Sequence, residues 1–245
     1  MKIPRSHPRY KSLIQRQLLI NGLRDGFVTE AGLIAHGRGE AFDYLLGERT
    51  TEEGEIAERV AIAMLLLSKN PVISVNGNTV ALVPRGIVEL ADITNSKIEV
   101  NLFHGSRERE ELIKKILREN GAKEVLISGE KYKLIPGLDS ERARVNPDGI
   151  WISDTVLVPL EDGDRTESLV RMRKNVISID LNPLSRTSQY ATISIVDNIV
   201  RAIPNMIEFA KEMKNCDKEE LNSIVSKFDN KKNLEKIIRR IRTEF

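Results

Sequence analysis

Polar residues follow two neighbouring strands that the sequence predicts, and their types suit a nucleotide. The predicted strand at 176–181 contains Asp180 at its end, and this carboxylate could accept hydrogen bonds from a ribose or an adenine. A polar cluster follows the turn, in which Arg186 and Thr187 are suited to phosphates. The next predicted strand ends just before Asn198, so two strand ends would converge on one ligand. An ordinary loop can contain such residues, but this convergence favours a binding site.

An arginine between two glycines is a second candidate. Arg38 lies between Gly37 and Gly39, follows His36 and precedes an apolar helical pattern. Glycine lets the backbone bend tightly and lets an anion approach its N–H groups, so a phosphate or a carboxylate would fit there. An ordinary glycine turn with an exposed arginine explains the segment equally well. His36 is a weaker candidate, because a single histidine is more often a structural hydrogen bonder than a catalyst.

Two amide side chains follow the predicted strand at 72–75. Asn76 and Asn78 flank a glycine, and in open α/β sheets ligands gather outside the carboxyl ends of the strands. These amides could therefore bind polar groups of a substrate. A tight turn is the alternative explanation, since Asn and Gly tolerate positive φ angles.

Four acidic residues surround Gly163 after the predicted strand at 155–160. Such acids could hold Mg²⁺, or one of them, for example Asp162, could act as a base on an amine. The regular order of an EF-hand calcium loop is missing. Capping of the following helix by Asp164 or Thr166 would explain one or two of the acids, but not all four.

Several common catalytic motifs are absent from the sequence. There is no G-x-G-x-x-G after a predicted strand, no G-x-x-x-x-G-K-[ST], no H-E-x-x-H and no pair of cysteines. These absences argue against dinucleotide oxidoreductases, P-loop NTPases, zincins and zinc-ribbon proteins. Any nucleotide site must therefore be of a less common kind.

The composition fits one large domain or two small ones. The chain has 245 residues, of which 40% are hydrophobic, and its formal net charge is +2. This balance excludes a strongly basic nucleic-acid coat. The charge is nevertheless uneven, because residues 1–24 contain six basic and no acidic residues. That segment makes a local cationic arm.

Neither secretion nor membrane insertion is indicated. The single cysteine, Cys216, cannot form an internal disulfide, and the first residues lack the apolar stretch of a secretory signal. The longest strictly apolar run, 60–67, is far shorter than the roughly 20 residues that a membrane span needs. We therefore expect a cytoplasmic protein without a membrane partner.

Short β-branched runs alternate with helical patterns, which is typical of β-α units around a largely parallel sheet. The pattern predicts strands at 72–75, 98–103, 125–127, 155–160, 176–181 and 192–196. It predicts helices at 8–24, 51–69, 107–120, 165–174, 199–214 and 218–242, the last with a break near 229–230. We expect an α/β, Rossmann-like fold whose sheet is flanked by helices and whose N- and C-terminal segments are helical.

The same pattern suggests three parts of one compact domain. These are a helical N-terminal segment at 1–70, a Rossmann-like core at 71–215 and C-terminal helices at 216–245. Apolar residues recur at helical spacing in the helix 51–69 and in the tail. Such stripes usually pack against the body of the protein or against a second subunit.

Longer stretches around these residues resemble the archaeal phosphopantothenate synthetase family, also called 4-phosphopantoate–β-alanine ligase. The resemblance covers nearly the whole chain and is carried by IPRSHPRY at 3–10, AGLIAHGRGEAFDYL at 31–45, VISVNGN at 72–78, VPLEDGDRTE at 158–167, IDLNPLSR at 179–186 and IVDNIVRA at 195–202. It implies an ATP-dependent ligase that joins 4-phosphopantoate to β-alanine and yields 4′-phosphopantothenate, AMP and pyrophosphate for coenzyme A synthesis. It also implies a homodimer with a Rossmann-like core.

The resemblance assigns ATP contacts to matching positions in this chain. They are Arg16, Arg38, Asp180, Leu181, Asn182, Arg186, Thr187, Asn198 and Ile199. The charge that develops when an acyl-adenylate forms would be stabilised by Arg38, Arg186 and Mg²⁺.

The remaining roles follow from chemical type. Arg9 or Arg16 could reach the substrate phosphate, because both belong to the cationic arm. The amine of β-alanine must lose a proton, for which His36, Glu161 and Asp162 are candidate bases.

Two other classes of function stay open on the sequence alone. One is a kinase or another nucleotide-dependent transferase that uses the same strand ends on a different small acid. The other is a nucleotide- or RNA-binding regulator, which the basic first helix would suit. Against the regulator, the chain has few aromatic residues and no basic segment interleaved with them for base stacking. We therefore expect no nucleic-acid partner.

Overall fold

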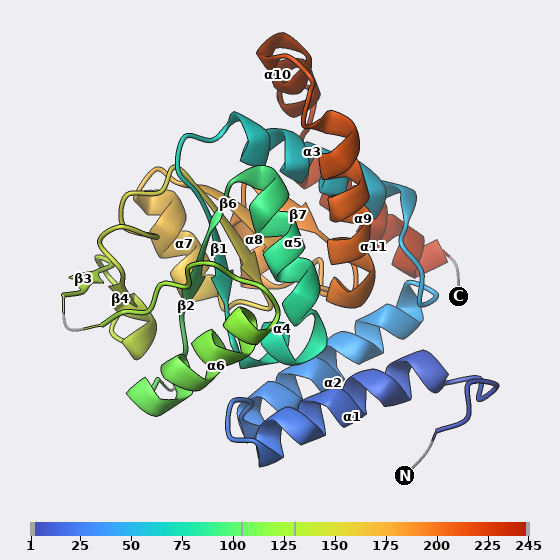
Figure 1. Cartoon of the computed structure of the whole chain (residues 1–245). Helices are drawn as coiled ribbons and strands as arrows, with labels where there is room; N and C mark the ends of the chain where they lie inside the picture. Colours follow the sequence, from blue (N-terminus) through green and yellow to red (C-terminus); the bar gives the residue numbers. More distant parts are fainter. Residues whose placement is uncertain (1–2, 104, 130, 244–245) are drawn as a thin grey trace.

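The computed structural model describes residues 3–103, 105–129 and 131–243, and within them five parallel strands form one sheet (Figure 1). Its order is β2 (Lys97–Val100), β1 (Pro71–Val75), β5 (Thr155–Pro159), β6 (Asn175–Ile179) and β7 (Ile193–Ile195). A short antiparallel pair, β3 (Lys133–Leu134) and β4 (Arg144–Val145), lies outside this sheet. The expected α/β fold with a parallel sheet flanked by helices is confirmed.

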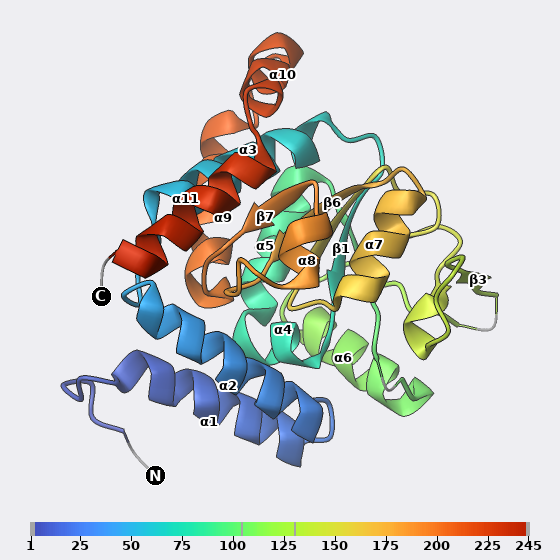
Figure 2. The same ribbon diagram turned by 180° about the vertical axis from the view of Figure 1, so that it is seen from behind.

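Helices cover both faces of the sheet. One face carries α3 (Glu52–Leu67), α5 (Pro84–Thr94) and α9 (Ile199–Met213), which pack against one another. The other face carries α7 (Gly163–Arg171) and α8 (Arg186–Tyr190), which Figure 2 shows in front of the strands. The remaining helices are α1 (Tyr10–Arg24), α2 (Glu30–Leu45), α4 (Gly77–Leu82), α6 (Arg107–Glu119), η1 (Glu141–Ala143), α10 (Lys218–Ser226) and α11 (Asn230–Thr243).

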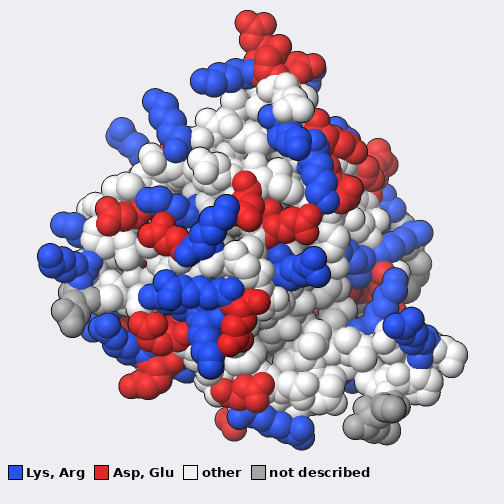
Figure 3. Space-filling view, in the orientation of Figure 1, with Lys and Arg blue, Asp and Glu red and all other residues white. Residues whose placement is uncertain are grey.

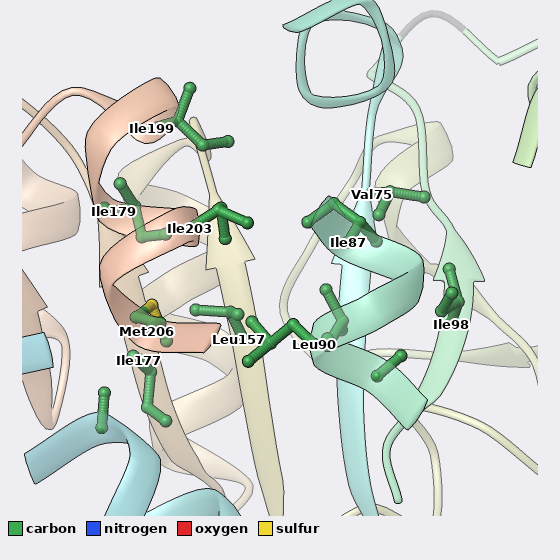
Figure 4. Close-up of a cluster of buried hydrophobic side chains, with 14 of the residues drawn as sticks. Val75, Ile87, Leu90, Ile98, Leu157, Ile177, Ile179, Ile199, Ile203 and Met206 are labelled. Atoms are coloured by element: carbon green, nitrogen blue, oxygen red, sulfur yellow. The ribbon is translucent and has the colours of Figure 1, made fainter. Parts of the chain in front are cut away.

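Strand periodicity divides the core between the two faces. Successive side chains of a strand point to opposite faces, so β5 directs Leu157 to one cluster and Val156 and Val158 to the other. Figure 4 shows Leu157 among side chains from α5 and α9, including Leu90 and Met206. Strands buried on both faces explain the nearly continuous apolar runs of the sequence.

The predicted strand at 125–127 is wrong as a strand of the described sheet. The segment makes one isolated bridge beside β2, where Leu126 N–H donates to Ile98 O at 2.8 Å and Val100 N–H donates to Leu126 O at 2.9 Å. Gly129, with φ of 63°, then adopts a left-handed conformation that an extended strand does not allow. The other five predicted strands are present, with shifted ends.

The segment His36 to Glu40 is helical, so the turn that the sequence predicts there is wrong. It lies inside α2, which begins where Thr29 Oγ1 accepts a hydrogen bond from Gly32 N–H. A glycine inside a helix costs about 1 kcal/mol relative to alanine. Packing of α2 against the sheet edge, described below, outweighs that cost.

Helices α4, α5 and α8 and the short helix η1 also have no counterpart among the expected helices. Asn76 caps α4 by accepting from Thr79 N–H at 3.0 Å, and Pro84 occupies the first turn of α5, where its missing N–H has no helical partner to lose. The expected helices at both ends are confirmed as α1 and as α10 with α11, separated near 229. The division into three parts stays a prediction. Within the described residues, none of the helices combines the length and the apolar character that crossing a membrane requires.

Candidate functional site

The strand order identifies one edge of the sheet as the place for a ligand. Taken along the chain, the five parallel strands have the order 2-1-3-4-5, in which the connection from β1 runs to one side and that from β5 to the other. A crevice forms between two such strands at their carboxyl ends. We call the ends of these five strands the carboxyl edge; it is where the predicted polar segments after β1, β5, β6 and β7 lie.

Helix α2 crosses this edge from β1 to β7. Near its start, Gly32 O accepts from Asn78 Nδ2 at 2.8 Å, just after β1. Gly39 lies against Leu181 after β6, and Asp43 accepts from Asn198 after β7 at 2.8 Å. Eleven helical residues span about 16 Å, which matches the roughly 14 Å of three strand spacings. The residues of α2 between these points therefore lie along the carboxyl edge, from the end of β1 to the end of β7.

Close packing explains two glycines of this region. A Cβ on Gly32 would lie 2.4 Å from Asn78 Oδ1, and a Cβ on Gly77 would lie 2.1 Å from Phe27 O. Neither position has room for a side chain. Gly37 instead has open space around it, and Gly39 has ordinary contacts with Leu181. Of the glycines of α2, Gly32 thus permits close approach of the helix to Asn78, and Arg38 extends from a helix rather than from a phosphate-binding turn.

Five polar side chains form what we call the α1–α2 cluster: Arg9, Arg16, His36, Glu40 and Tyr44. Arg16 binds Glu40 through both Nε and Nη2, at 3.0 and 2.8 Å. Tyr44 donates to Glu40 at 2.6 Å, and Arg9 donates to Tyr44 at 2.7 Å. The guanidinium groups of this cluster remain open to water, since the side chains of Arg9 and Arg16 are 46% and 42% exposed.

This environment sets the charges of the cluster. Burial raises the pKa of Glu40, but the hydrogen bonds from Tyr44 and Arg16 outweigh burial and hold it below its usual value. Burial lowers the pKa of His36, and nearby Arg16 adds to this effect against the opposing pull of Glu40 and Asp43. His36 is therefore a neutral imidazole near pH 7.

Asp180 and Arg38 lie near each other at the end of β6. Asp180 accepts from Asn182 N–H at 3.0 Å and from the Ser185 hydroxyl at 2.5 Å. Burial raises the pKa of Asp180, while these two hydrogen bonds and the Arg38 guanidinium oppose the rise. The predicted Arg38 is exposed and close enough to act on this carboxyl electrostatically.

Asn198 ties the two N-terminal helices to the end of β7. Its Nδ2 donates to Gln15 of α1 at 3.0 Å and to Asp43 of α2 at 2.8 Å, while its Oδ1 caps α9. Only 5% of Asn198 is exposed, and Ile199 is 1% exposed. In this arrangement the Asn198 side chain is structural. A ligand at the carboxyl edge could contact only the small exposed part of Asn198 and Ile199.

The predicted phosphate residues Arg186 and Thr187 join α8 to the start of α7. Arg186 pairs with Asp164 and with Glu167, the latter at 2.8 Å, and its side chain is 58% exposed. Thr187 is buried and donates to Glu161 O at 2.9 Å. The Arg186 guanidinium can therefore turn from its surface acids to a ligand, whereas Thr187 supports the loop.

Two more predicted site residues have structural hydrogen bonds. Asn76 donates through Nδ2 to Pro159 O and Leu160 O, both at 3.1 Å, and so joins the ends of β1 and β5 across the crevice. Asp162 accepts from Arg165 N–H at 2.8 Å and from Arg142 at 2.9 Å. Helix capping, the alternative for the acidic segment, is therefore present, but Asp162 is the cap.

A group of buried ions beneath β3 and β4 has no counterpart in the sequence interpretation. We call Glu99, Arg142, Glu161 and Arg165 the buried cluster; Arg165 is 0% exposed and bonds to Ser74 and Glu161. Arg142 also pairs with Glu161. Burial lowers the pKa values of Arg142 and Arg165 to about 10 and raises that of Glu99 to about 7.

The acidic segment does not assemble into a metal site. Among the residues that the structure describes, no group of three or more His, Cys, Asp or Glu side chains is placed to hold a metal ion. Glu161 and Asp162 are paired with arginines, and Asp164 and Glu167 pair with Arg186. In this structure the charges of these acids are therefore balanced by arginines.

Comparison with known proteins places the chain in a family. A family model described as phosphopantothenate/pantothenate synthetase matches residues 53–244. A protein of Thermococcus kodakarensis named 4-phosphopantoate–β-alanine ligase is 54% identical over 242 residues, which are 99% of this chain and 93% of that protein. Proteins of the same name from Methanosarcina mazei and Methanospirillum hungatei are 55% and 49% identical, over 98% and 91% of this chain and 94% and 89% of their own lengths. The chain therefore belongs to the phosphopantothenate/pantothenate synthetase family.

Proposed function

We propose that the protein is an ATP-dependent 4-phosphopantoate–β-alanine ligase that acts in coenzyme A biosynthesis. Relatives of that name match this chain over nearly its whole length and theirs. The structural observation that supports the proposal is the course of α2 along the carboxyl edge, where Arg38 is close enough to Asp180 to act on it electrostatically. A crevice with cations along one wall suits a reaction in which two polyanions must meet.

The reaction that we propose has two steps. In the first, a carboxylate oxygen of 4-phosphopantoate bonds to the α-phosphorus of ATP, the bond to the β-phosphate oxygen breaks and pyrophosphate leaves. In the second, the amine of β-alanine bonds to the carbonyl carbon of this acyl-adenylate and AMP leaves. Adenylation makes amide formation possible because AMP is a far better leaving group than hydroxide.

Several residues would hold ATP during the first step. We assign the nucleoside to Asp180, Leu181 and Asn182 with Asn198 and Ile199, and the triphosphate to Arg16, Arg38, Arg186 and Thr187. Support comes from the side chains of the three arginines, all of which are at least partly exposed. Arg38 would stabilise the charge that develops on the α-phosphate. Mg²⁺ would neutralise part of the triphosphate, which would itself supply most of the ligands, because the described chain offers no cluster of acids for the ion.

The other substrate of the first step, 4-phosphopantoate, would bind at the α1–α2 cluster. Arg9 lies in the α1–α2 cluster and is 46% exposed, so it can receive the phosphate of 4-phosphopantoate. His36, neutral at physiological pH, can donate one hydrogen bond to an anion without repelling Arg16. We place His36 in the adenylation step. Asn76 and Asn78 would act indirectly, since their side chains hold the strand end and α2.

Product analysis tests this function. The purified protein should form AMP and pyrophosphate from ATP only when 4-phosphopantoate and β-alanine are present, and should exchange labelled pyrophosphate into ATP with 4-phosphopantoate alone. Formation of ADP would contradict an adenylate and indicate an acyl phosphate. Phosphorylation of unphosphorylated pantoate would instead identify a kinase.

We also propose that the enzyme is a cytoplasmic homodimer. Leu18, Ile34 and Leu45 of α1 and α2 are 38%, 66% and 36% exposed, which is unusual for large apolar side chains. Figure 3 shows that the surface over α1 is mostly uncharged on this face. Light scattering coupled to gel filtration should give twice the chain mass. A monomer at micromolar concentration would contradict the dimer.

A further inference from the structure

A small polar cavity lies at the carboxyl end of β2, on the other side of β1 from the residues assigned to ATP. Its volume is about 210 Å³, and its walls include Asn101, Ser106, Arg107, Glu110, Ser128 and Arg144. A larger cavity of about 450 Å³ lies at the opposite edge of the sheet, near Lys69 and Lys97, where the strands begin. Only the smaller cavity therefore lies at the edge where the proposed reaction takes place.

Two hydrogen bonds join the elements around the cavity to β1 and to the turn before α2. Asn101 follows β2 directly, and its N–H donates to Val75 O at the end of β1 at 2.9 Å. Arg109 of α6 donates to Phe27 O in the turn between α1 and α2 at 3.1 Å. Helix α6 thus forms one wall next to the point where α2 begins to cross the carboxyl edge. A ligand in the cavity would approach the crevice from the side opposite to ATP.

One part of the cavity suits a carboxylate. Ser106 caps the 13-residue helix α6, and Arg107 is exposed in its first turn. The N-terminal end of a helix has a partial positive charge that favours anions. Arg144 contributes a second guanidinium from the other wall, where it pairs with Glu141 at 3.1 Å. These groups together can bind one carboxylate.

Another part suits an ammonium group. Glu110 is half-buried and accepts from the Ser128 hydroxyl at 2.9 and 3.2 Å. Asn101 is 3% exposed, and its Nδ2 is held by the carbonyl oxygens of Arg142 and Arg144, while its Oδ1 accepts no hydrogen bond within the described residues. The amide oxygen of Asn101 and the carboxylate of Glu110 both accept hydrogen bonds, so together they favour a cationic donor such as an ammonium group.

The charge balance selects between the substrates. Glu110 and Glu141 would repel the dianionic phosphate of 4-phosphopantoate or the phosphates of ATP. A volume of about 210 Å³ is also below the 300–1,000 Å³ that is usual for pockets of larger ligands. A short zwitterion has a charge of each sign to pair with the walls, and it is small enough for the volume of the cavity.

We propose that this cavity binds the amino-acid substrate, with its carboxylate on Arg107 and Arg144 and its ammonium on Glu110, which takes the proton. This inference rests on the proposed ligase function. One ammonium proton moves to the Glu110 carboxylate, and the freed nitrogen pair forms the C–N bond to the acyl carbon. The C–O bond to AMP breaks and its electron pair leaves with the phosphate. The second nitrogen proton passes to solvent.

The surroundings of Glu110 suit this role. Burial raises its pKa, while Ser128 and Arg107 oppose the rise and Glu111 on the same helix adds to it. Glu141 and Arg144 line the facing wall and pair with each other. A carboxylate whose pKa lies above its usual value is a better proton acceptor than an exposed one. The proposal therefore replaces His36 and Asp162 as the base in the second step.

Separate assays of the two steps test the proposal. Arg107→Ala should raise the KM for β-alanine about tenfold while the KM for ATP stays within twofold. Its pyrophosphate exchange with 4-phosphopantoate, which needs no β-alanine, should keep the wild-type rate. Lys115→Ala is the matched control, since Lys115 is on α6, 71% exposed and outside the cavity. An unchanged KM for β-alanine would overturn the proposal, and so would an equal loss in both assays.

Glu110 gives an independent test. Glu110→Gln should lower kcat of the complete reaction about a hundredfold, a usual effect for a lost base, and should remove the decline of kcat at low pH that protonation of Glu110 causes. Glu110→Asp should restore part of the rate. Hydroxylamine, which needs no such base, should still trap the acyl-adenylate in Glu110→Gln at the wild-type rate. Loss of trapping would overturn the role of Glu110, whereas absence of exchange in the wild-type protein would refute the proposed function itself.

Discussion

The carboxyl edge carries two groups of charges that use the same residue types in different environments. In the α1–α2 cluster, Arg9 and Arg16 remain 46% and 42% exposed although both bond to Glu40. In the buried cluster, Arg165 and Glu161 have side chains that are 0% and 3% exposed. Exposed ion pairs contribute about 0–1 kcal/mol, whereas removing one member of a buried pair costs about 3–5 kcal/mol. The open cluster can therefore exchange its partners for a ligand, while the buried cluster maintains the fold.

This difference bears on the interpretation of the segment at 158–167. Its acids suggest catalysis, yet Glu161 binds Arg165 of α7 and Asp162 binds Arg142, which lies in the chain between β3 and β4. In the sequence Arg9 and Arg16 belong to a basic arm, and in the structure both bind Glu40 of α2, the helix that crosses the carboxyl edge. Burial therefore decides which charges are available for chemistry.

The largest effect should follow from breaking the buried cluster. Arg165→Met removes one of the two arginines that bind the buried Glu161, the other being Arg142, and it also removes the bond to Ser74. This change should lower the free energy of unfolding by about 3–5 kcal/mol. Urea denaturation followed by circular dichroism measures this change. Arg171→Met, at an arginine of the same helix whose side chain is 71% exposed, is the control and should change stability by less than about 0.5 kcal/mol. Equal stability of the two variants would contradict the distinction between the clusters.

Glu58, a buried residue of α3, provides a test of pH dependence. Burial, and then the charge of Asp197, raise the pKa of Glu58 to about 9, and the side chain is 0% exposed. The unfolded carboxyl titrates near pH 4.5, so between about pH 4.5 and 9 the folded state binds more protons than the unfolded state. Stability must therefore fall as pH rises through this window, by up to about 1.4 kcal/mol per pH unit.

Glu58→Gln should remove that dependence. The amide mimics the protonated acid, because it can accept from Asn205 as Glu58 does at 3.1 Å and can donate towards Asp197. Between pH 6 and 8 the wild type should lose about 2–3 kcal/mol relative to this variant, which melting temperatures across the pH range would show. Glu55→Gln, one turn earlier and exposed, should follow the wild type. Parallel curves for wild type and Glu58→Gln would refute a protonated Glu58.

The sequence predicts the fold better than it predicts the roles of single residues. Apolar strand runs and capped helices are local signals, so five strands and most helices can be found from them. Helix α2 is not predicted at 36–40, because Gly37 and Gly39 weaken the local signal and the contacts with Leu181 and Asn198 that favour the helix are distant in sequence.

For the candidate site, the sequence predicts its location at the edge of the sheet but not the contacts of its side chains. Strand ends converge by topology, so Asp180 and Asn198 can be expected at one edge. Glu161 and Asp162 pair with Arg142, which comes from a separate loop, and nothing in the local sequence indicates that pairing. The cavity beside α6 likewise depends on Asn101 and Arg144 meeting across the fold.

A substitution of Arg38 tests whether the exposed arginine near Asp180 acts in catalysis. Arg38→Ala should lower kcat/KM by tenfold or more, which is about 1.4 kcal/mol or more of transition-state stabilisation. Its stability should stay near that of the wild type, because Arg38 is exposed. Arg118→Ala, at an exposed arginine near the end of α6, should keep full activity. A wild-type rate for Arg38→Ala would show that proximity to Asp180 has no role in the reaction.

The smallest effect on stability should come from the α1–α2 cluster itself. In Arg16→Ala, Glu40 keeps its hydrogen bond from Tyr44 at 2.6 Å, so the free energy of unfolding should fall by less than about 1 kcal/mol. The KM for ATP should nevertheless rise severalfold, since Arg16 can leave Glu40 to meet a phosphate. Gln17→Ala, on the next residue of α1, should leave that KM unchanged. If Arg16→Ala instead destabilised the protein as much as Arg165→Met, exposure would not separate the two clusters, and Arg16 would belong to the structural framework.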